Sequence, residues 1–261
     1  MNTYVEARDV ASAVAAMAAG ARPVAGGTDL VVGARHGKAP LPEALVGIHR
    51  IAELSAITET EDGGLRIGAL VTHAAILASP LLAARMPGLL DASAIVGSHA
   101  TRANGTLGGN VMNASPAMDT GAPLLCHGAY VVLTGRSGTR NEGLPELWTG
   151  PGQTSAAPDE LLEAVEIPAV DPDFGAASSA YVRLQYRRQM EIAVVGAGAW
   201  VQLSSDGTRV HGAAVAITSL APVIHRVAEA DAALAGAPTT GEGLDAAVRA
   251  AGEAAAAAAR P

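Results

Sequence analysis

The chain has 261 residues, of which 49% are hydrophobic, 16% are charged and only 3% are aromatic. This length and composition predict one large or two to three smaller folded domains, and they exclude a disordered tail. The net charge of −8, without a lysine or arginine run, argues against nucleic acid or an anionic membrane as a partner.

The first part of the chain predicts a βαβ-like opening. Apolar stretches bounded by capping residues predict strand, helix, strand and helix in turn, over residues 3–7, 10–19, 22–25 and 30–36, with Asp9 as the cap of the first helix. The second strand runs into Gly26-Gly27, after which Thr28 or Asp29 can cap a helix. A glycine turn before a helix start is suited to binding an anion, although a plain tight turn explains this loop equally well.

The middle of the chain alternates between short strands and short helices. Strands are expected at residues 44–48, 57–60, 65–70, 129–134 and 159–167, and helices at 73–78, 89–96 and 123–127. His73 and His99 lack metal-ligand spacing, so we expect ordinary surface or capped residues and not metal ligands. Cys126 lies in an apolar stretch, and we expect a buried, inert thiol there. A single cysteine also excludes an internal disulfide.

Residues 98–119 are expected to form a long functional loop. The segment contains a second glycine pair within Thr106-Leu107-Gly108-Gly109-Asn110, and it is rich in small polar side chains. Long loops of this composition are usually functional. Asp119 can accept hydrogen bonds from the hydroxyls of a ribose or ribityl chain. Asp119 and three other polar residues are candidates to line one cavity, namely Asn110, Asn113 and Ser115.

The last third predicts an antiparallel hairpin followed by helices. Residues 171–175 are expected to be a linker, and strands are expected at 180–186, 193–203 and 210–218. Helices are expected at 225–234 and 244–259. No internal repeat is visible.

Two glycine turns that each present N–H groups suggest one long ligand with a diphosphate, held from both sides.

Four motifs, in order, resemble the FAD-binding medium subunit of the molybdenum hydroxylases, the family that includes xanthine and aerobic carbon monoxide dehydrogenases. The motifs are Ala25-Gly26-Gly27-Thr28-Asp29-Leu30, Gly105–Asn110 with Ala114–Asp119, Gly150–Thr154 with Glu160–Pro168, and Arg187–Ala193. The resemblance implies an α+β fold. A two-part FAD-binding domain of the vanillyl-alcohol-oxidase/PCMH type, residues 1–54 and 55–170, precedes a C-terminal subdomain, residues 176–261, with a three-stranded antiparallel sheet and helices.

The resemblance also implies which residues bind FAD. The backbones of Pro23, Val24, Ala25, Gly26, Gly27, Thr28, Asp29 and Leu30, and of Thr106, Leu107, Gly108, Gly109 and Asn110, would hold the diphosphate. Asp119 would bind cofactor hydroxyls, and Leu162 would contact the flavin end through its backbone. Arg183 would lie near the cofactor, and Ile192 would cover one face of the isoalloxazine ring. No catalytic residue and no metal ligand is expected in this chain.

The activity implied by the resemblance is electron relay in a complex. A large molybdenum–pterin subunit and a small subunit with [2Fe–2S] clusters would be partners, in a dimer of heterotrimers. The FAD of this chain would pass electrons to NAD, a quinone or oxygen. Glu191 replaces an aspartate that is common in relatives, and a further C-terminal segment of the family is not seen after Arg260-Pro261.

Other functions remain open on the residues alone. They are a self-standing flavoprotein, a nucleotide-binding module without redox chemistry, and a nicotinamide dehydrogenase, which the missing G-x-G-x-x-G spacing disfavours. The N-terminus lacks the basic and apolar regions of a signal peptide, and no apolar run reaches the ~20 residues of a membrane span. We therefore expect a soluble cytoplasmic protein.

Overall fold

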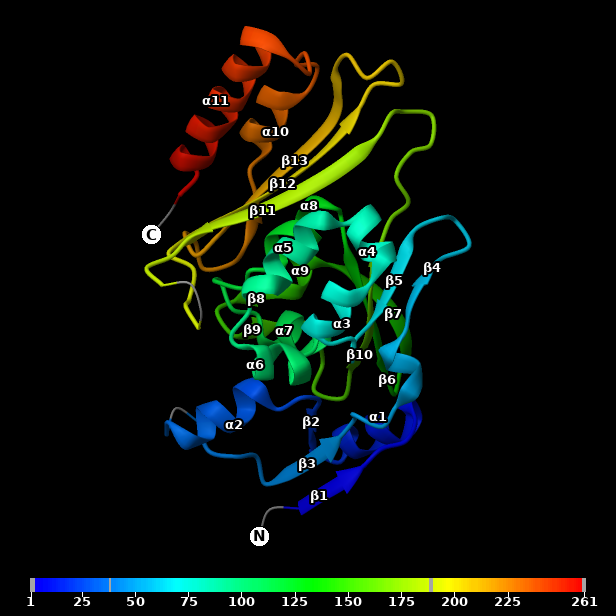
Figure 1. The fold of residues 1–261 in the computed structure, drawn as a ribbon. Helices are drawn as coiled ribbons and strands as arrows, with labels where there is room; N and C mark the ends of the chain where they lie inside the picture. The colour runs from blue at the N-terminus through cyan, green and yellow to red at the C-terminus, as the bar shows by residue number, and fades with distance from the viewer. Residues whose placement is uncertain (1–2, 38, 188–189, 260–261) are drawn as a thin grey trace.

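The computed structural model describes residues 3–37, 39–187 and 190–259. Figure 1 shows three stacked parts that follow one another along the chain, with the N-terminal part at the bottom and the C-terminal helices at the top. The central part carries the largest hydrophobic cluster, and a separate apolar cluster lies in each of the outer parts.

The N-terminal part is a small parallel sheet with two helices. Its strand order is β1-β3-β2, formed by Thr3–Glu6, Ala44–Gly47 and Arg22–Val24. Helix α1 (Val10–Ala18) begins where Asp9 accepts a 2.7 Å hydrogen bond from the Ser12 N–H, as the sequence predicts. Helix α2 (Thr28–Arg35) buries none of its residues. This arrangement confirms the predicted βαβ-like opening.

The central part is a five-stranded antiparallel sheet with helices packed against it. The strand order is β4-β5-β10-β6-β7, formed by Ile57–Glu59, Leu65–Gly68, Leu161–Ile167, Tyr130–Gly135 and Gly138–Gly143. A 3-10 turn at Ala52–Ser55 precedes the sheet. The helices are α3 (His73–Ala78), α4 (Pro80–Arg85), α5 (Pro87–Ile95), α6 (His99–Asn104), α7 (Leu107–Asn113), α8 (Gly121–Cys126) and α9 (Leu144–Leu147), with a two-stranded ribbon of β8 (Trp148–Gly150) and β9 (Gln153–Thr154).

The long irregular loop expected at residues 98–119 is wrong, because helices α6 and α7 occupy most of it. Side-chain caps explain both helices. The Ser98 hydroxyl accepts a hydrogen bond from the Thr101 N–H, and the Thr106 hydroxyl accepts one from the Gly109 N–H. Each cap satisfies an N–H group that would otherwise lack a partner at a helix start.

The C-terminal part is an antiparallel sheet with two helices. Strands β11 (Ala177–Leu184), β12 (Val195–Leu203) and β13 (Val210–Thr218) form the hairpin that the sequence predicts, and β14 (His225–Arg226) adds a fourth strand. The helix expected from residue 225 begins only at Ala228, because residues 225 and 226 pair with β13. Helices α10 (Ala228–Leu234) and α11 (Gly241–Ala257) pack on β13.

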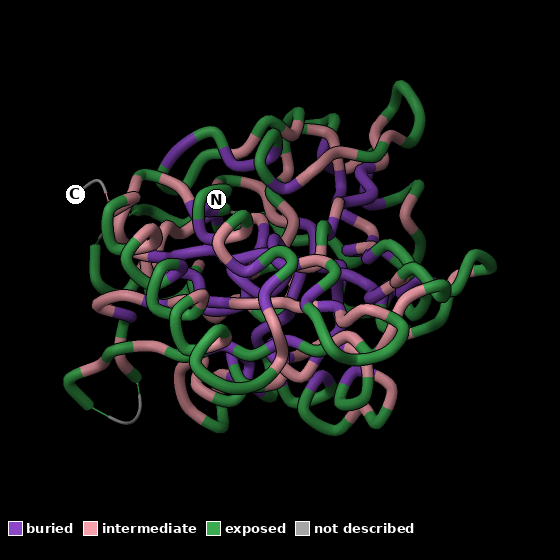
Figure 2. Tube along the Cα trace, turned by 90° about the horizontal axis from the view of Figure 1, so that it is seen from above, coloured by how far each residue is buried: buried purple, intermediate pink, exposed green. Residues whose placement is uncertain are grey.

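Burial follows this three-part arrangement. Figure 2 shows the buried segments concentrated in the middle of the molecule and the exposed segments around its edge. Cys126 is buried beside the Gly198 carbonyl, and burial raises the pKa of its thiol to about 12, which confirms the expected inert thiol. Within the described residues, no helix is long and apolar enough to cross a membrane.

Candidate functional site

The first glycine loop, residues 23–30, presents a row of free backbone N–H groups. Helix α2 starts from Gly27, whose φ of 67° lies in the left-handed region that favours glycine. The expected side-chain cap from Thr28 or Asp29 is wrong, because no side chain caps this helix. Among the described residues, the N–H groups of residues 25–30 donate no hydrogen bond. Free N–H groups at a helix start form a site for an anion.

The two glycine loops meet at a backbone contact. A Cβ atom built on Gly26 would lie 1.8 Å from the carbonyl oxygen of Asn104, which ends α6 just before the second loop. A Cβ built on Gly105 would lie 3.5 Å from the Thr28 hydroxyl oxygen. Figure 1 shows α2 beside α6 at the junction of the lower and central parts. The structure therefore brings both loops together, as the sequence predicts.

In the second loop, residues 106–110, most of the backbone N–H groups donate hydrogen bonds to other groups of the protein. The N–H groups of Leu107 and Gly108 donate to the carbonyls of Val71 and Ala69 at 2.8 and 3.0 Å, and those of Gly109 and Asn110 donate to Thr106. A Cβ on Gly108 would press against Ala69 at 2.6 Å, whereas one on Gly109 would meet only the Thr106 hydroxyl at 3.0 Å. Gly108 serves packing, whereas Gly109 is exposed and, apart from the Thr106 hydroxyl, has open space at its Cβ position.

His73 is buried against Gly105, just before the second loop, which corrects the expected surface position, although it begins helix α3, which the Thr72 side chain caps as expected. Its side chain is 2% exposed, and its N–H donates to the Gly105 carbonyl at 3.1 Å. Burial, with a smaller effect of the Arg102 charge, lowers the pKa of His73 to about 4. His127 is also partly surrounded, with its ring beside Trp200 and its Nε2 2.9 Å from the Ser179 hydroxyl, and burial lowers its pKa to about 4.

These two histidines predict a loss of stability in mild acid. An unfolded histidine binds a proton near pH 6.5, whereas His73 and His127 stay neutral in the folded chain down to about pH 4. Between these values the unfolded state binds more protons, so stability falls as the pH is lowered, by up to about 1.4 kcal/mol per pH unit for each histidine. Urea unfolding between pH 7 and pH 4.5 measures this slope.

Replacement of a buried histidine tests the cause of the slope. His73→Gln is expected to lower stability at pH 7 and to flatten its fall towards pH 4.5. The matched control is His99→Gln, because His99 is exposed on the nearby helix α6. An equal flattening in both variants would contradict the assignment of the acid sensitivity to buried histidine.

Asp119 and Arg183 lie together in a buried ion pair. The Asp119 carboxylate accepts a hydrogen bond from Arg183 Nη1 on Oδ2 and one from the Tyr181 hydroxyl on Oδ1, both at 2.8 Å. Burial raises the pKa of the Asp119 carboxyl, and the Tyr181 hydrogen bond and the Arg183 charge oppose that rise. The neighbouring Thr120 hydroxyl donates to Asn110 Oδ1 at 2.6 Å, which links this pair to the second glycine loop.

Leu162 and Ile192, predicted to contact the flavin, lie in different surroundings. The Leu162 side chain is buried in the central cluster, at a bulge in β10 where the register with β6 shifts. Ile192 is 74% exposed, in the connection between β11 and β12. Leu162 therefore offers only its backbone to a ligand, whereas Ile192 offers an uncovered apolar side chain.

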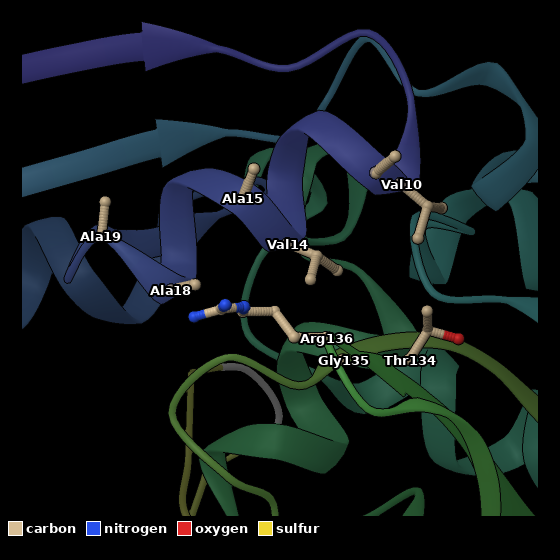
Figure 3. Close-up of a pocket in the computed structure, with 9 residues that line it drawn as sticks. Val10, Val14, Ala15, Ala18, Ala19, Thr134, Gly135 and Arg136 are labelled. Atoms are coloured by element: carbon tan, nitrogen blue, oxygen red, sulfur yellow. The ribbon is translucent and has the colours of Figure 1, made fainter.

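A separate apolar groove of about 720 Å³ lies between α1 and the turn after β6. Figure 3 shows the Arg136 side chain reaching beneath the C-terminal end of α1, with Val14 and Ala18 above it. The described residues that line the groove include none of the predicted site residues. The groove is therefore not the place where the two glycine loops meet.

Comparison with known proteins identifies the family. Residues 1–170 match the family described as FAD binding domain in molybdopterin dehydrogenase. The chain belongs to this family. Residues 180–261 match a second family, described as CO dehydrogenase flavoprotein C-terminal domain. The two matches together confirm the resemblance and the predicted α+β fold.

Similar proteins are subunits of molybdenum-containing dehydrogenases. The chain is 34% identical to the carbon monoxide dehydrogenase medium chain of Afipia carboxidovorans, over 94% of this chain and 83% of that one. It is 30% identical to the xanthine dehydrogenase FAD-binding subunit of Escherichia coli O157:H7, over 71% of this chain and 62% of that one. The solved structure of carbon monoxide dehydrogenase from Hydrogenophaga pseudoflava superposes with a TM-score of 0.89 at 30% identity, covering 100% of this chain and 88% of that chain.

The geometry of the site fits FAD, the group that the family implies. A diphosphate needs several N–H donors in one concavity, and residues 25–30 supply free ones at the start of α2. The contact of Gly26 with Asn104 brings the second loop alongside this row, in a space that a larger side chain would close. No cluster of histidine, cysteine or acidic residues among the described residues is able to hold a metal ion.

Three residues at the site were not predicted from the sequence. Asn104 supplies the carbonyl that Gly26 packs against, His73 supports Gly105, and Tyr181 holds Asp119. The sequence could have indicated Tyr181, because it lies two positions before Arg183 on a predicted strand and therefore shares a face of the strand with it. No local pattern points to Asn104 or His73, since both act through contacts between distant segments.

Proposed function

We propose that this chain is the flavin subunit of a molybdenum hydroxylase complex, which passes electrons from [2Fe–2S] clusters of a small partner subunit to an external acceptor. The row of free N–H groups at residues 25–30, in the loop that contacts Asn104 and Gly105, carries the proposal. FAD supplies the redox chemistry, so the chain's own task is to bind, orient and shield this cofactor.

Each residue group has a separate task in this proposal. The N–H groups at the start of α2 hold the diphosphate, and Gly109 allows the second loop to approach it without a side chain. The Asp119 carboxylate holds the Arg183 guanidinium in place. The exposed Ile192 side chain is proposed to lie against one face of the planar isoalloxazine ring. The backbone of Leu162 is proposed to reach the flavin end from the bulge in β10.

The proposed organisation extends to domains and partners. We propose FAD-binding units at residues 1–54 and 55–170 and a flavoprotein unit at 176–261. A large molybdenum–pterin subunit and the small iron–sulfur subunit complete the cytoplasmic complex, as a dimer of heterotrimers. Clusters on a partner supply the electrons, because the described residues provide no group of metal ligands.

Purification of the complex from its native host tests this function. We expect a flavin absorption spectrum, acid-released FAD, and two co-purifying subunits that contain molybdenum and iron. FAD on a chain that elutes alone at every salt concentration would favour a self-standing flavoprotein. A nucleotide without flavin absorbance would instead identify a binding module without redox chemistry.

A further inference from the structure

The described residues of the connection between β11 and β12 carry uncovered apolar side chains. Tyr186 is 88% exposed, Met190 61% and Ile192 74%. Exposed apolar area of this size costs free energy unless another apolar surface covers it. The described part of this segment, residues 185–187 and 190–194, is nevertheless held by hydrogen bonds near both ends. They involve the Gln185 side chain at the first end and the Glu191 and Ala193 carbonyls at the second.

One arginine holds both ends of this segment. Arg183 Nε donates to the Gln185 side-chain oxygen at 2.7 Å, and Nη1 donates to the Glu191 carbonyl at 3.3 Å. The Arg183 side chain is 1% exposed, so these hydrogen bonds are shielded from water. The guanidinium therefore determines where the residue next to Glu191, Ile192, is held.

The same guanidinium is anchored on its other side to the FAD-binding part of the chain. Nη1 pairs with Asp119 at 2.8 Å, and Nη2 donates to the Ile95 carbonyl at the end of α5 at 3.3 Å. Tyr181 holds the second oxygen of Asp119, and its hydroxyl lies only 2.0 Å from where a Cβ on Gly196 would be. Arg183 thus joins the segment to α5 and, through Asp119 and Thr120, to the second glycine loop.

An arginine has five N–H donors, and four of those of Arg183 are used by four different protein acceptors. This guanidinium therefore has only one N–H group left that could donate a hydrogen bond to a ligand. We propose that Arg183 is a positioning residue, which holds the segment of Tyr186, Met190 and Ile192 over the flavin without binding the cofactor itself. The inference rests on the proposed FAD binding and changes the role expected for Arg183 from a cofactor contact to a support.

Two replacements of Arg183 test this role in the full chain loaded with FAD. Arg183→Met removes all four hydrogen bonds, and Arg183→Lys keeps a charge opposite Asp119 but loses the fork that reaches the other acceptors. We expect both variants to keep the Kd for FAD within about threefold of wild type. We expect iodide to quench the flavin fluorescence at least about threefold more effectively, because the covering segment is released.

The matched control is Arg187→Met, which changes an arginine of the same segment. Its side chain is 68% exposed, and both of its partners, the Glu191 carboxylate at 3.5 Å and the Met190 carbonyl at 2.5 Å, lie within the segment, so it does not tie the segment to the rest of the chain. We expect wild-type quenching and affinity in this variant. A purely structural role for Arg183 would lower the urea midpoint of Arg183→Lys while its flavin spectrum and quenching stay those of wild type, and that result would overturn the inference.

Trypsin cleavage after Arg187 gives a readout that needs no FAD. In the flavin-free chain we expect Arg183→Lys and Arg183→Met to be cut at Arg187 several times faster than wild type, by mass spectrometry, because a released segment enters the protease more readily. Should Arg183→Met not fold, the lysine variant carries the test. Unchanged cleavage would overturn the positioning role. A 100-fold loss of FAD affinity in the lysine variant would overturn it as well. A wild-type chain that binds no FAD would overturn the proposed function instead.

Discussion

Replacing Gly26 with alanine is expected to reduce the affinity for FAD by at least about 100-fold. The new Cβ would lie 1.8 Å from the Asn104 carbonyl oxygen, whereas ordinary contact begins at 3.4 Å, so the loops must separate by roughly 1.6 Å. Hydrogen bonds to a charged group each contribute about 1.5–3 kcal/mol, and loss of one such bond already costs about a factor of ten. Fluorescence titration with FAD measures the change.

The control for Gly26→Ala is Gly33→Ala, in helix α2, which begins two residues after Gly26. No atom lies within 4 Å of a Cβ at Gly33, so alanine there is expected to leave FAD binding unchanged. It is also expected to stabilise the helix by up to about 1 kcal/mol, since alanine is the better helix former. Wild-type FAD affinity in Gly26→Ala would show that the two loops do not form one site.

The second large effect is expected at the neighbouring glycines of the second loop. Gly109→Val should abolish FAD binding while the chain still folds, because its Cβ meets only the Thr106 hydroxyl and the valine side chain would stand in the open space through which the second loop is proposed to approach the diphosphate. Gly108→Ala should instead destabilise the fold by about 1–3 kcal/mol, because its Cβ overlaps Ala69 in a packed region.

The two variants are distinguished by measuring FAD affinity and the urea midpoint on the same preparations. We expect a loss of affinity with a near-normal midpoint for Gly109→Val, and a lowered midpoint for Gly108→Ala. A Gly109→Val chain that retains FAD would place the cofactor elsewhere. A lowered midpoint for Gly109→Val, equal to that of Gly108→Ala, would show that Gly109 also serves packing.

Local patterns predicted most of the regular elements and the first glycine turn, because each depends on neighbouring residues, but they did not predict α4, α9 or β7. The strand-to-helix turn at Gly26-Gly27 and the cap at Asp9 are visible in a few letters of sequence. The helices at residues 99–113 were missed, because single hydroxyl caps start them in a stretch whose glycines and polar residues resemble a loop. Strand β14 was missed because its two residues pair with a strand that lies elsewhere in the fold.

The candidate site was only partly predictable for the same reason. The glycine pairs indicate bare backbone, but no pattern shows that only the first loop keeps its N–H groups free. Asp119 and Arg183 were both singled out, yet their pairing joins segments 64 residues apart and involves Tyr181. Burial of His73 likewise depends on the packing of α3 against α5 and α6, which periodicity does not reveal.

Titration of the purified, flavin-free chain with FAD tests the central claim most directly. The account predicts saturable binding at one FAD per chain, with a changed visible spectrum, and much weaker binding of FMN, which lacks the diphosphate that residues 25–30 are proposed to hold. Equal affinity for FAD and FMN would contradict the assignment of the diphosphate to the first loop. No binding of either flavin would contradict the account as a whole.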